Sequence, residues 1–439
     1  MNMSRAGRRV RRAIYGVVGL GLAVLAIFAV ARSDEGLWQV VGFALGPDLP
    51  LLVGGSRERG RIRRWAVRPY NATHRFVGPI VLAVISLGLG AAWLAGALAW
   101  AGHVALDRSL GFDLRAPDGF QRTEPPRRRP VLRAVGGVAA LAVAAGAAYE
   151  ALAARGDPDR YLAPGRLVNV GDHRLHLYCL GSGSPTVVME AGLGEQSLTW
   201  SLVQPEVATA ARVCTYDRAG YGWSEAGPVP RTPGREATEL HELLAAAEER
   251  GPYVLVAHSI GAIESRLFLD RYPEEVAGMV LVEPTDPEAV ISAGTPVLPI
   301  AQYRLFSVLG TLGLVRLFGR SLVPWMVGTE PPDPVMDNAA VVYGPRSLAT
   351  AAEELRASVE GARDVSAATA PGAWGSLPIV VITAGSDGDP ELGEEVAALS
   401  EASRHIVADG SGHYVQYERP QVVVDAIVDV VERARTEGS

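Results

Sequence analysis

The chain has 439 residues, of which 48% are hydrophobic and 20% are charged. This length suggests two or three domains, and this composition excludes a disordered protein and indicates a membrane-embedded part. The net charge of −7 hides an asymmetry, because residues 1–155 carry 21 arginines against nine acidic residues, whereas residues 156–439 carry 20 against 39. The arginines of the first part flank apolar segments, so we attribute them to membrane topology and expect no binding of nucleic acid.

Four apolar segments are predicted to enter or cross a membrane. The first has 18 residues without a charge, just enough to span a hydrocarbon core of about 30 Å. It begins like a signal peptide, but no small-residue cleavage motif follows, so we predict an uncleaved helix. The four segments are residues 14–31, residues 37–54 (interrupted by Pro47 and Asp48), residues 76–106 and residues 134–154.

The loops between these segments predict the topology. Residues 56–75 and residues 107–133 hold seven arginines each, which places both loops in the cytoplasm. Residues 76–106 should then form a hairpin of two short helices that turn near Gly88–Gly90, and residues 134–154 should lead the chain outward. We therefore expect an integral protein of the bacterial inner membrane whose C-terminal part lies outside the cytoplasm. A single crossing by the third segment would place that part inside instead.

Four polar residues interrupt the apolar part, namely Asp48, His74, His103 and Asp107. A carboxylate within an apolar span costs roughly 2.5–3.5 kcal/mol, so Asp48 needs a partner. His103 and Asp107 are four residues apart, on one face of a helix end. Imidazole and carboxylate groups on converging helices could hold a divalent metal. The simpler interpretation, which we favour on sequence alone, is interfacial histidines with capped or paired aspartates.

The strings that contain these residues carry a resemblance. Within about residues 36–122, PD, YNATH and WAGHVALDRSLGFDLRAPDGF resemble a small bacterial inner-membrane domain family of unknown function. The pattern of PD, H and HxxxD is also similar to membrane-bound proteins described as metal-dependent hydrolases. Its most specific part is HxxxDRxLG. This resemblance implies a membrane domain and leaves a metal-dependent function of the N-terminal half open.

From Gly165 onward, short β-rich runs alternate with helical stretches, which predicts a mostly parallel sheet with helices on both faces. A hairpin is expected first, turning at Gly171-Asp172. The later runs are TVVME (186–190), RVCTYD (212–217), YVLVAH (253–258), AGMVLVE (277–283), PIVVITA (378–384) and HIVAD (405–409), and the helices are expected at about 234–250, 260–272, 391–402 and 420–435.

The run YVLVAHSIGAIESRLFL predicts a nucleophile elbow at Ser259, because a strand leads into a serine between small residues and a helix follows at once. The base is assigned to His413, which follows the last strand and precedes the last helix. For the acid we favour Asp387, with Asp389 and Glu283 as alternatives, since each follows a predicted strand. The backbone N–H groups of Leu193 and Ile260 are the expected oxyanion donors; the list of candidates is therefore Ser259, His413, Asp387, Asp389, Glu283, Leu193 and Ile260.

The motifs EAGLG, CTYDRAGYGWSE, HSIGA and GSGHY, in this order, resemble the α/β-hydrolase superfamily over about residues 165–436. The resemblance implies an α/β-hydrolase fold with an eight-stranded, mostly parallel sheet, and a Ser-His-acid triad that needs no cofactor and attacks an ester, amide or related carbonyl. About 95 residues between two strands should form a helical cap. The predicted domains are residues 1–133 (multi-span membrane domain), 134–164 (last span and linker), 165–284 and 378–439 (hydrolase core), and 285–377 (cap).

The cap contains apolar residues that could line an acyl pocket, or could only pack the cap onto the core. They are Phe306, Leu309, Leu312, Leu317, Phe318, Trp325 and Met326. The two cysteines, Cys179 and Cys214, fall in neighbouring predicted strands. A disulfide is possible there, but cross-strand geometry often disfavours one, so we expect two buried free thiols.

The leading functional hypothesis is a membrane-anchored serine hydrolase that cleaves a small or lipidic carboxylic ester. The alternatives are a peptidase or amidase of the proline-iminopeptidase type, and a metal-dependent function of the N-terminal half. A non-catalytic binding module is disfavoured, because a serine, a histidine and an acid all stand in the expected order.

Overall fold

The computed structural model describes every residue except 1–4, 31–35, 57, 59–60, 90, 113, 121–142, 367–370, 387 and 438–439. The chain divides into two compact units, Met1–Ala145 and Gly146–Ser439, here called the N-terminal unit and the C-terminal unit. The domain boundary predicted at residues 133–134 lies outside the described residues.

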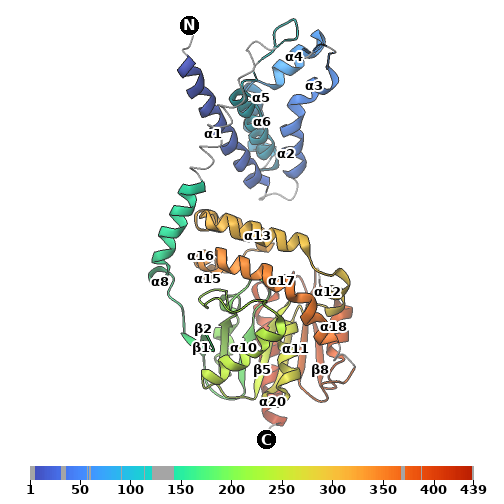
Figure 1. Ribbon diagram of the computed structural model, residues 1–439. Coiled ribbons are helices and arrows are strands. Elements are labelled where there is room, and N and C mark those ends of the chain that lie inside the picture. Colours follow the sequence, from blue (N-terminus) through green and yellow to red (C-terminus); the bar gives the residue numbers. More distant parts are fainter. Residues whose placement is uncertain are drawn as a thin grey trace. The chain divides into compact units, whose positions relative to one another are not determined.

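Helices build the N-terminal unit (Figure 1). The central element is α6, against which α1, α2 and α5 pack. The residues predicted to form a hairpin, 76–106, hold α5 and most of α6, with residue 90 between the two helices outside the described part. The elements are α1 (Arg5–Val30), α2 (Gly36–Leu45), η1 (Gly46–Asp48), α3 (Leu49–Val53), α4 (Arg64–Thr73), α5 (Val77–Leu89) and α6 (Ala91–Leu110).

The membrane spans expected from the sequence can be compared with the helices. Of the residues that the structure describes, no single helix is both long and apolar enough to cross a bilayer. Shorter apolar helices cover Arg12–Ala23, Gln39–Val53 and Val77–Ser86. In the C-terminal unit one pair of helices, Val297–Thr311 with Leu314–Arg320, meets the criteria of length and composition together, although it bends by 102° between them.

The C-terminal unit begins within a helical segment, residues 143–153, which is followed by η2 (Ala154–Gly156) and α8 (Asp157–Arg160). Its described strands form one eight-stranded sheet in the order β1-β2-β4-β3-β5-β6-β7-β8. The pairs β1–β2 and β2–β4 are antiparallel and all others are parallel, as predicted. The strands are β1 (Arg166–Val170), β2 (His173–Leu180), β3 (Thr186–Glu190), β4 (Val213–Asp217), β5 (Tyr253–His258), β6 (Val276–Val282), β7 (Ile379–Ala384) and β8 (Ser403–Ala408).

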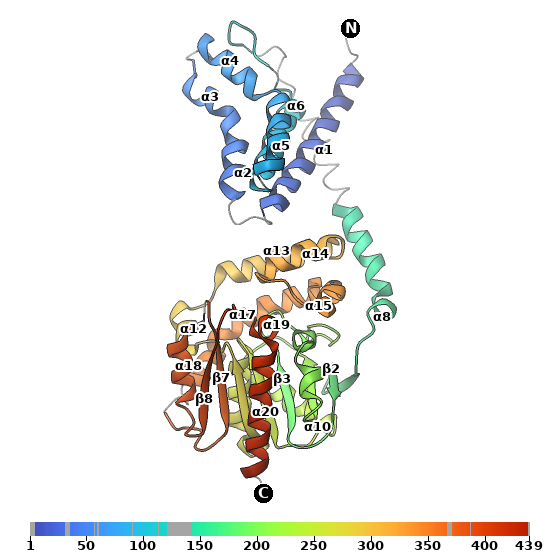
Figure 2. The same ribbon diagram turned by 180° about the vertical axis from the view of Figure 1, so that it is seen from behind.

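Helices cover both faces of this sheet, and the central strands are therefore buried along their whole length. In Figure 1, α10 (Pro233–Ala246) and α11 (Gly261–Arg271) lie on one face, and Figure 2 shows α20 (Pro420–Glu437) on the other. Two hydrophobic clusters result, one on each face. The remaining helices of this layer are η3 (Ser197–Trp200), α9 (Gln204–Val207), η4 (Pro273–Glu275), α18 (Pro390–Ala397) and α19 (Val415–Glu418).

A group of helices between β6 and β7 forms the cap. It has its own small core, to which Phe306 belongs, with Leu309 and Met326 packed against it. Leu317 and Phe318 are exposed instead, and nothing is described of the Trp325 side chain. The cap consists of α12 (Pro287–Ala293), α13 (Val297–Thr311), α14 (Leu314–Val327), α15 (Asp333–Asp337), α16 (Ala339–Val342) and α17 (Pro345–Ser366).

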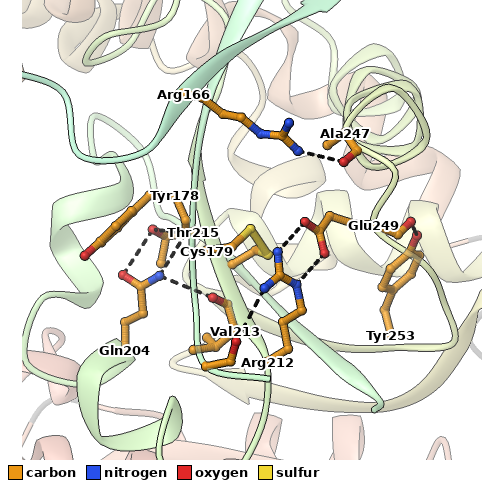
Figure 3. Close-up of a disulfide and its surroundings, with 12 residues drawn as sticks. Arg166, Tyr178, Cys179, Gln204, Arg212, Val213, Thr215, Ala247, Glu249 and Tyr253 are labelled. Carbon is orange, nitrogen blue, oxygen red and sulfur yellow. Dashed lines mark hydrogen bonds and ion pairs between the residues drawn. A yellow bond between two sulfur atoms is a disulfide. The ribbon is translucent and has the colours of Figure 1, made fainter. Parts of the chain in front are cut away.

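The two cysteines form a disulfide, so the prediction of free thiols was wrong (Figure 3). Cys179 of β2 lies directly opposite Cys214 of β4 in the antiparallel register. Directly opposite residues in such a pair share one face of the sheet, which brings the two sulfur atoms together. Beside the bridge, Arg212 donates two hydrogen bonds to Glu249, of 2.6 and 2.7 Å.

Candidate active site

Ser259 lies at a sharp turn between β5 and α11. Its φ angle is 54°, in the left-handed region that residues other than glycine rarely adopt. The Ser259 N–H donates to the Val282 carbonyl (3.0 Å), and the Thr285 N–H donates to the Ser259 carbonyl (3.2 Å). These contacts with the end of β6 hold the strained turn, which is the arrangement of a nucleophile elbow.

The small residue two positions after the serine, Gly261, is required because the loop that follows β3 approaches it closely. A Cβ atom at Gly261 would lie 2.7 Å from the Ala191 carbonyl oxygen, which is closer than real Cβ contacts come. On the other side of the serine, Ala257 is completely buried. The elbow therefore packs tightly on both sides, which explains the small residues in the motif.

Glu283 follows β6 directly and is held between two strands. Its φ is 48°, its N–H donates to the Ile382 carbonyl (2.7 Å), and its Oε1 accepts from the Ala384 N–H (2.5 Å). Burial raises the pKa of this carboxyl, but the hydrogen bonds from His413 and Ala384 outweigh burial and hold the pKa below its ordinary value. Glu283 is thus kept as a carboxylate.

His413 lies in the loop between β8 and α19, where its Nδ1 is 3.4 Å from Glu283 Oε2. A carboxylate can only accept, so Nδ1 is the donor and Nε2 is left free to take a proton. The His413 side chain is 43% exposed and that of Glu283 is 11% exposed. The pair therefore presents a solvent-accessible base backed by a mostly buried acid.

The structure separates two of the three acids considered from the sequence. Glu283 contacts His413, whereas Asp389 caps α18, its Oδ1 accepting from the Glu391 and Leu392 N–H groups at 3.1 Å each. Asp387, the acid favoured from the sequence, lies outside the described residues. Of the described acids in question, Glu283 is the one in place to orient the imidazole.

The remaining parts of the site are the serine hydroxyl and the oxyanion donors. No hydrogen bond joins the described residues Ser259 and His413, a contact that often tightens only when substrate binds. The N–H groups of Leu193 and Ile260 donate to none of the residues that the structure describes. Both groups belong to the loops beside Ser259, and both are available to an incoming oxygen atom.

A buried His258–Glu195 pair, which the sequence did not indicate, underlies these loops. His258 Nδ1 lies 2.8 Å from Glu195 Oε1, and His258 Nε2 lies 2.9 Å from the His413 carbonyl. Burial lowers the pKa of His258 and raises that of Glu195, but their mutual attraction prevails and shifts both pKa values the other way. A Cβ atom at Gly192 would lie 2.8 Å from His258 Nδ1, so only glycine fits above the pair.

Arg218, which the sequence also did not indicate, holds the loop after β3 through hydrogen bonds to its backbone. Its guanidinium donates to the carbonyls of Ala191 (2.6 Å) and Gly192 (2.8 Å). It also pairs with Glu190 of β3 (2.7 Å) and with Glu354 of the cap helix α17 (3.0 Å). All three charged side chains are buried. A network of buried charges therefore positions the loop after β3, residues 191–194, here called the oxyanion loop.

The four polar residues of the N-terminal unit are brought together. Each of Asp48, His74, His103 and Asp107 offers one possible metal-ligand atom, and these four atoms all lie within 4.8 Å of one another. A second group with metal-binding residue types, Cys179, Cys214 and Glu249, has both sulfur atoms committed to the disulfide.

A mostly parallel sheet, a serine elbow and a histidine backed by an acid define an α/β-hydrolase domain. Residues 183–426 match the model of the Alpha/beta hydrolase family, so the chain belongs to that family. Residues 13–125 match a domain of unknown function (DUF4260).

Several relatives are similar over part of the chain. An uncharacterized protein of Schizosaccharomyces pombe is 34% identical over 36% of this chain and 35% of its own. The uncharacterized protein YqjL of Bacillus subtilis is 38% identical over 24% of this chain and 41% of its own, and an AB hydrolase superfamily protein of Gibberella zeae is 38% identical over 23% and 32%. The chain thus spans less than half the length of each of these relatives.

Solved structures are similar in fold. That of DBJA has a TM-score of 0.51 and 19% identity, covering 62% of this chain and 98% of that one. That of a mutant of a putative epoxide hydrolase from Pseudomonas aeruginosa has a TM-score of 0.51 and 16% identity, covering 62% and 96%. At such identities the likeness concerns the fold alone.

Proposed function

We propose that the C-terminal unit is a serine hydrolase that cleaves a small or lipidic carboxylic ester through an acyl-enzyme. The observation that carries this proposal is the contact of His413 with Glu283, formed beside the strained turn of Ser259. A serine alone is a weak nucleophile, and it needs an adjacent base that is itself held by a third group. The three residues supply these roles in the chain order that is typical of the fold.

The chemistry follows from these positions. His413 Nε2 takes the proton of Ser259 Oγ as that oxygen attacks the ester carbonyl, and the N–H groups of Ile260 and Leu193 stabilise the oxyanion. The imidazolium, stabilised by Glu283, then gives its proton to the departing alkoxide and leaves an acyl-serine. Water attacks the acyl-serine by the same route, which releases the carboxylic acid and restores Ser259.

An exposed apolar surface on the cap supports a lipidic substrate. Its side chains belong to α13 and α14, and exposed apolar groups gathered on neighbouring elements mark sites of interaction. They are Val297, Leu298, Leu305, Val308, Leu317 and Phe318, of which Leu298 is 82% exposed. Such a surface suits a hydrolase that receives its ester from a lipid phase.

The test is labelling of the purified full-length protein with a fluorophosphonate probe, followed by hydrolysis of p-nitrophenyl esters of increasing chain length. Labelling should disappear in Ser259→Ala and persist in Ser292→Ala, a matched loss of a serine in the cap. Folded wild-type protein that neither labels nor hydrolyses any ester would refute the proposal. Faster cleavage of matched anilides than of esters would favour the peptidase or amidase alternative.

We also propose that the N-terminal unit anchors the chain in the bacterial inner membrane, with the hydrolase on the outer side. Many outward-facing side chains of α2, α3 and α5 are apolar, among them Leu45, Leu52, Val77, Ile80 and Val84. The disulfide supports the outer side, because such bonds persist in oxidising compartments. The chain should resist carbonate extraction from membranes, and a C-terminal alkaline phosphatase fusion should be active. Activity of a C-terminal cytoplasmic reporter would contradict this topology.

A further inference from the structure

Four side chains from three segments of the N-terminal unit point into one cluster. Asp48 ends η1, His74 follows the last residue of α4, and His103 and Asp107 lie one turn apart on α6. The segments are far apart in sequence, so the cluster arises from the packing of the unit. Each residue type is a common ligand of divalent transition metals.

The distances within the cluster are those of ligands around a single ion. His74 Nε2 lies 3.3 Å from His103 Nε2, 3.3 Å from Asp48 Oδ1 and 3.2 Å from Asp107 Oδ2, and His103 Nε2 lies 3.8 Å from each carboxylate oxygen. A tetrahedron with metal–ligand bonds of about 2.1 Å has edges of about 3.4 Å. An octahedron with the same bonds has shorter edges, of about 3.0 Å. The observed spacing is closer to the tetrahedron.

The orientation of His74 leaves a lone pair directed into the cluster. Its Nδ1 lies 2.9 Å from the Tyr70 carbonyl and must donate to it, so in the neutral ring Nε2 is the unprotonated nitrogen. That nitrogen faces one oxygen each of Asp48 and Asp107, which is the orientation of a histidine ligand whose other ring nitrogen is held by a backbone carbonyl. The His74 side chain is only 2% exposed, so solvent does little to screen it.

Backbone groups near the cluster are tied together by further hydrogen bonds. Thr73 Oγ1 lies 3.0 Å from the Pro47 carbonyl, which links the end of α4 to η1. From α6, Trp100 Nε1 donates to the Thr73 carbonyl (2.6 Å) and Arg108 Nη2 donates to the His74 carbonyl (2.9 Å). These outer contacts fix the positions of the three segments that carry the candidate ligands, as outer-shell hydrogen bonds do in known metal sites.

We propose that Asp48, His74, His103 and Asp107 bind one divalent transition-metal ion, with Zn²⁺ as the best fit. Two imidazole nitrogens and two carboxylate oxygens at tetrahedral spacing suit Zn²⁺, whereas Mg²⁺ and Ca²⁺ prefer oxygen ligands alone. The ion reaches the site past Asp48, whose side chain is 41% exposed. The site belongs to the N-terminal unit and is independent of the proposed hydrolase chemistry.

The test is Zn²⁺ binding by the full-length chain, purified in detergent with a tag that contains no histidine, stripped with a chelator and dialysed against micromolar Zn²⁺. Wild-type protein should retain one ion per chain. His103→Ala and Asp48→Asn should weaken binding by about tenfold or more, whereas His241→Ala, a histidine of α10 in the other unit, should not. Co²⁺ in place of Zn²⁺ should give the intense visible absorption of a tetrahedral site.

Each other result overturns a stated part. Stripped, folded wild-type protein that retains no Zn²⁺, or a His103→Ala variant that binds as the wild type does, refutes the metal site. One bound Co²⁺ with weak absorption refutes the tetrahedral arrangement. If His103→Ala fails to fold, as judged by circular dichroism, Asp48→Asn decides, because its side chain is the most exposed of the four and its loss leaves the packing intact.

Discussion

His413 donates a hydrogen bond from Nδ1 to Glu283 Oε2 across 3.4 Å, although the whole cap separates the two residues in the chain. Glu283 follows β6, the strand next to that of Ser259, and Ser259 itself donates to the last residue of β6. One strand end therefore positions both the nucleophile turn and the acid, which couples their geometries.

Neutralising this acid should impair catalysis strongly. In Glu283→Gln the amide no longer stabilises the imidazolium, and its NH₂ group can favour the wrong tautomer of His413. We expect kcat on p-nitrophenyl esters to fall by about 10²–10⁴-fold, with little change in KM. Asp389→Asn is the matched control, since asparagine caps α18 as well as aspartate does. The same loss in Asp387→Asn, with Glu283→Gln nearly unchanged, would instead make Asp387 the acid.

The His258–Glu195 pair should give stability a particular dependence on pH. Glu195 has a lowered pKa, so its contribution is complete above its ordinary value of 4.5 and is lost as the pH falls through the lowered value. His258 has a raised pKa, so its contribution is complete below its ordinary value of 6.5 and is lost as the pH rises through the raised value. Both contributions are complete only between these two values.

Thermal unfolding of His258→Gln across pH 4 to 9, compared with the wild type, measures this dependence. The difference in Tm should be largest between pH 4.5 and 6.5 and should shrink at higher pH. His241→Gln, which removes a half-exposed imidazole from α10, is the control and should cost less. A difference in Tm that grows steadily above pH 7 would show that His258 is neutral in the folded protein.

The disulfide should contribute measurably to stability. It closes a loop with a sequence separation of 35 residues, for which restriction of the unfolded chain is worth about 4 kcal/mol. Urea unfolding of the C-terminal unit within the full-length protein should therefore shift to lower urea after reduction, by about 2–4 kcal/mol. Cys179→Ala combined with Cys214→Ala should reproduce the shift and remove its sensitivity to reductant. Two thiols that react with iodoacetamide in unreduced, denatured protein would show that the bridge is absent.

Arg218 should matter far more than an arginine in a comparable pair at the surface. Arg218→Met leaves the buried Glu190, Glu264 and Glu354 without their common cation, at a cost of about 3–5 kcal/mol in the free energy of unfolding. It also removes the donors to the oxyanion loop, so kcat should fall in protein that remains folded. Arg174→Met, in the exposed pair with Glu225, should cost far less. Equal costs for the two variants would contradict this assignment.

The sequence predicted those features that depend on local pattern or chain order. The sheet and the helices over it are confirmed, because each buried strand is a continuous apolar run. The catalytic roles of Ser259 and His413 stay predictions: the first rests on residues within two positions of it, and the second on its place between the last strand and the last helix. His103 and Asp107 stand one helical turn apart, which is also legible from spacing alone.

Features that depend on distant contacts were not predictable in this way. The choice among the acids depends on which strand end reaches the His413 loop, and Glu283 does so through a positive φ that its residue type does not signal. The partner of His258, Glu195, lies 63 residues away in the chain, so no local pattern signals the pair. The free thiols were predicted wrongly because the register of β2 against β4 cannot be inferred from the strands separately.

The cap is held by ion pairs at two of its helices, α17 and α14. Glu354 ties α17 to Arg218 and to the Tyr221 hydroxyl (2.8 Å) inside the core, so this helix cannot swing away without exposing a buried charge. Helix α14 is held as well, because the Arg316 guanidinium donates to the carboxylates of Glu150 and Asp157. Tyr303 of α13 lies over Gly194 in the oxyanion loop, where even an added methyl group would meet its hydroxyl at 3.4 Å. Tyr303 therefore limits the space for a substrate whose carbonyl oxygen approaches this loop.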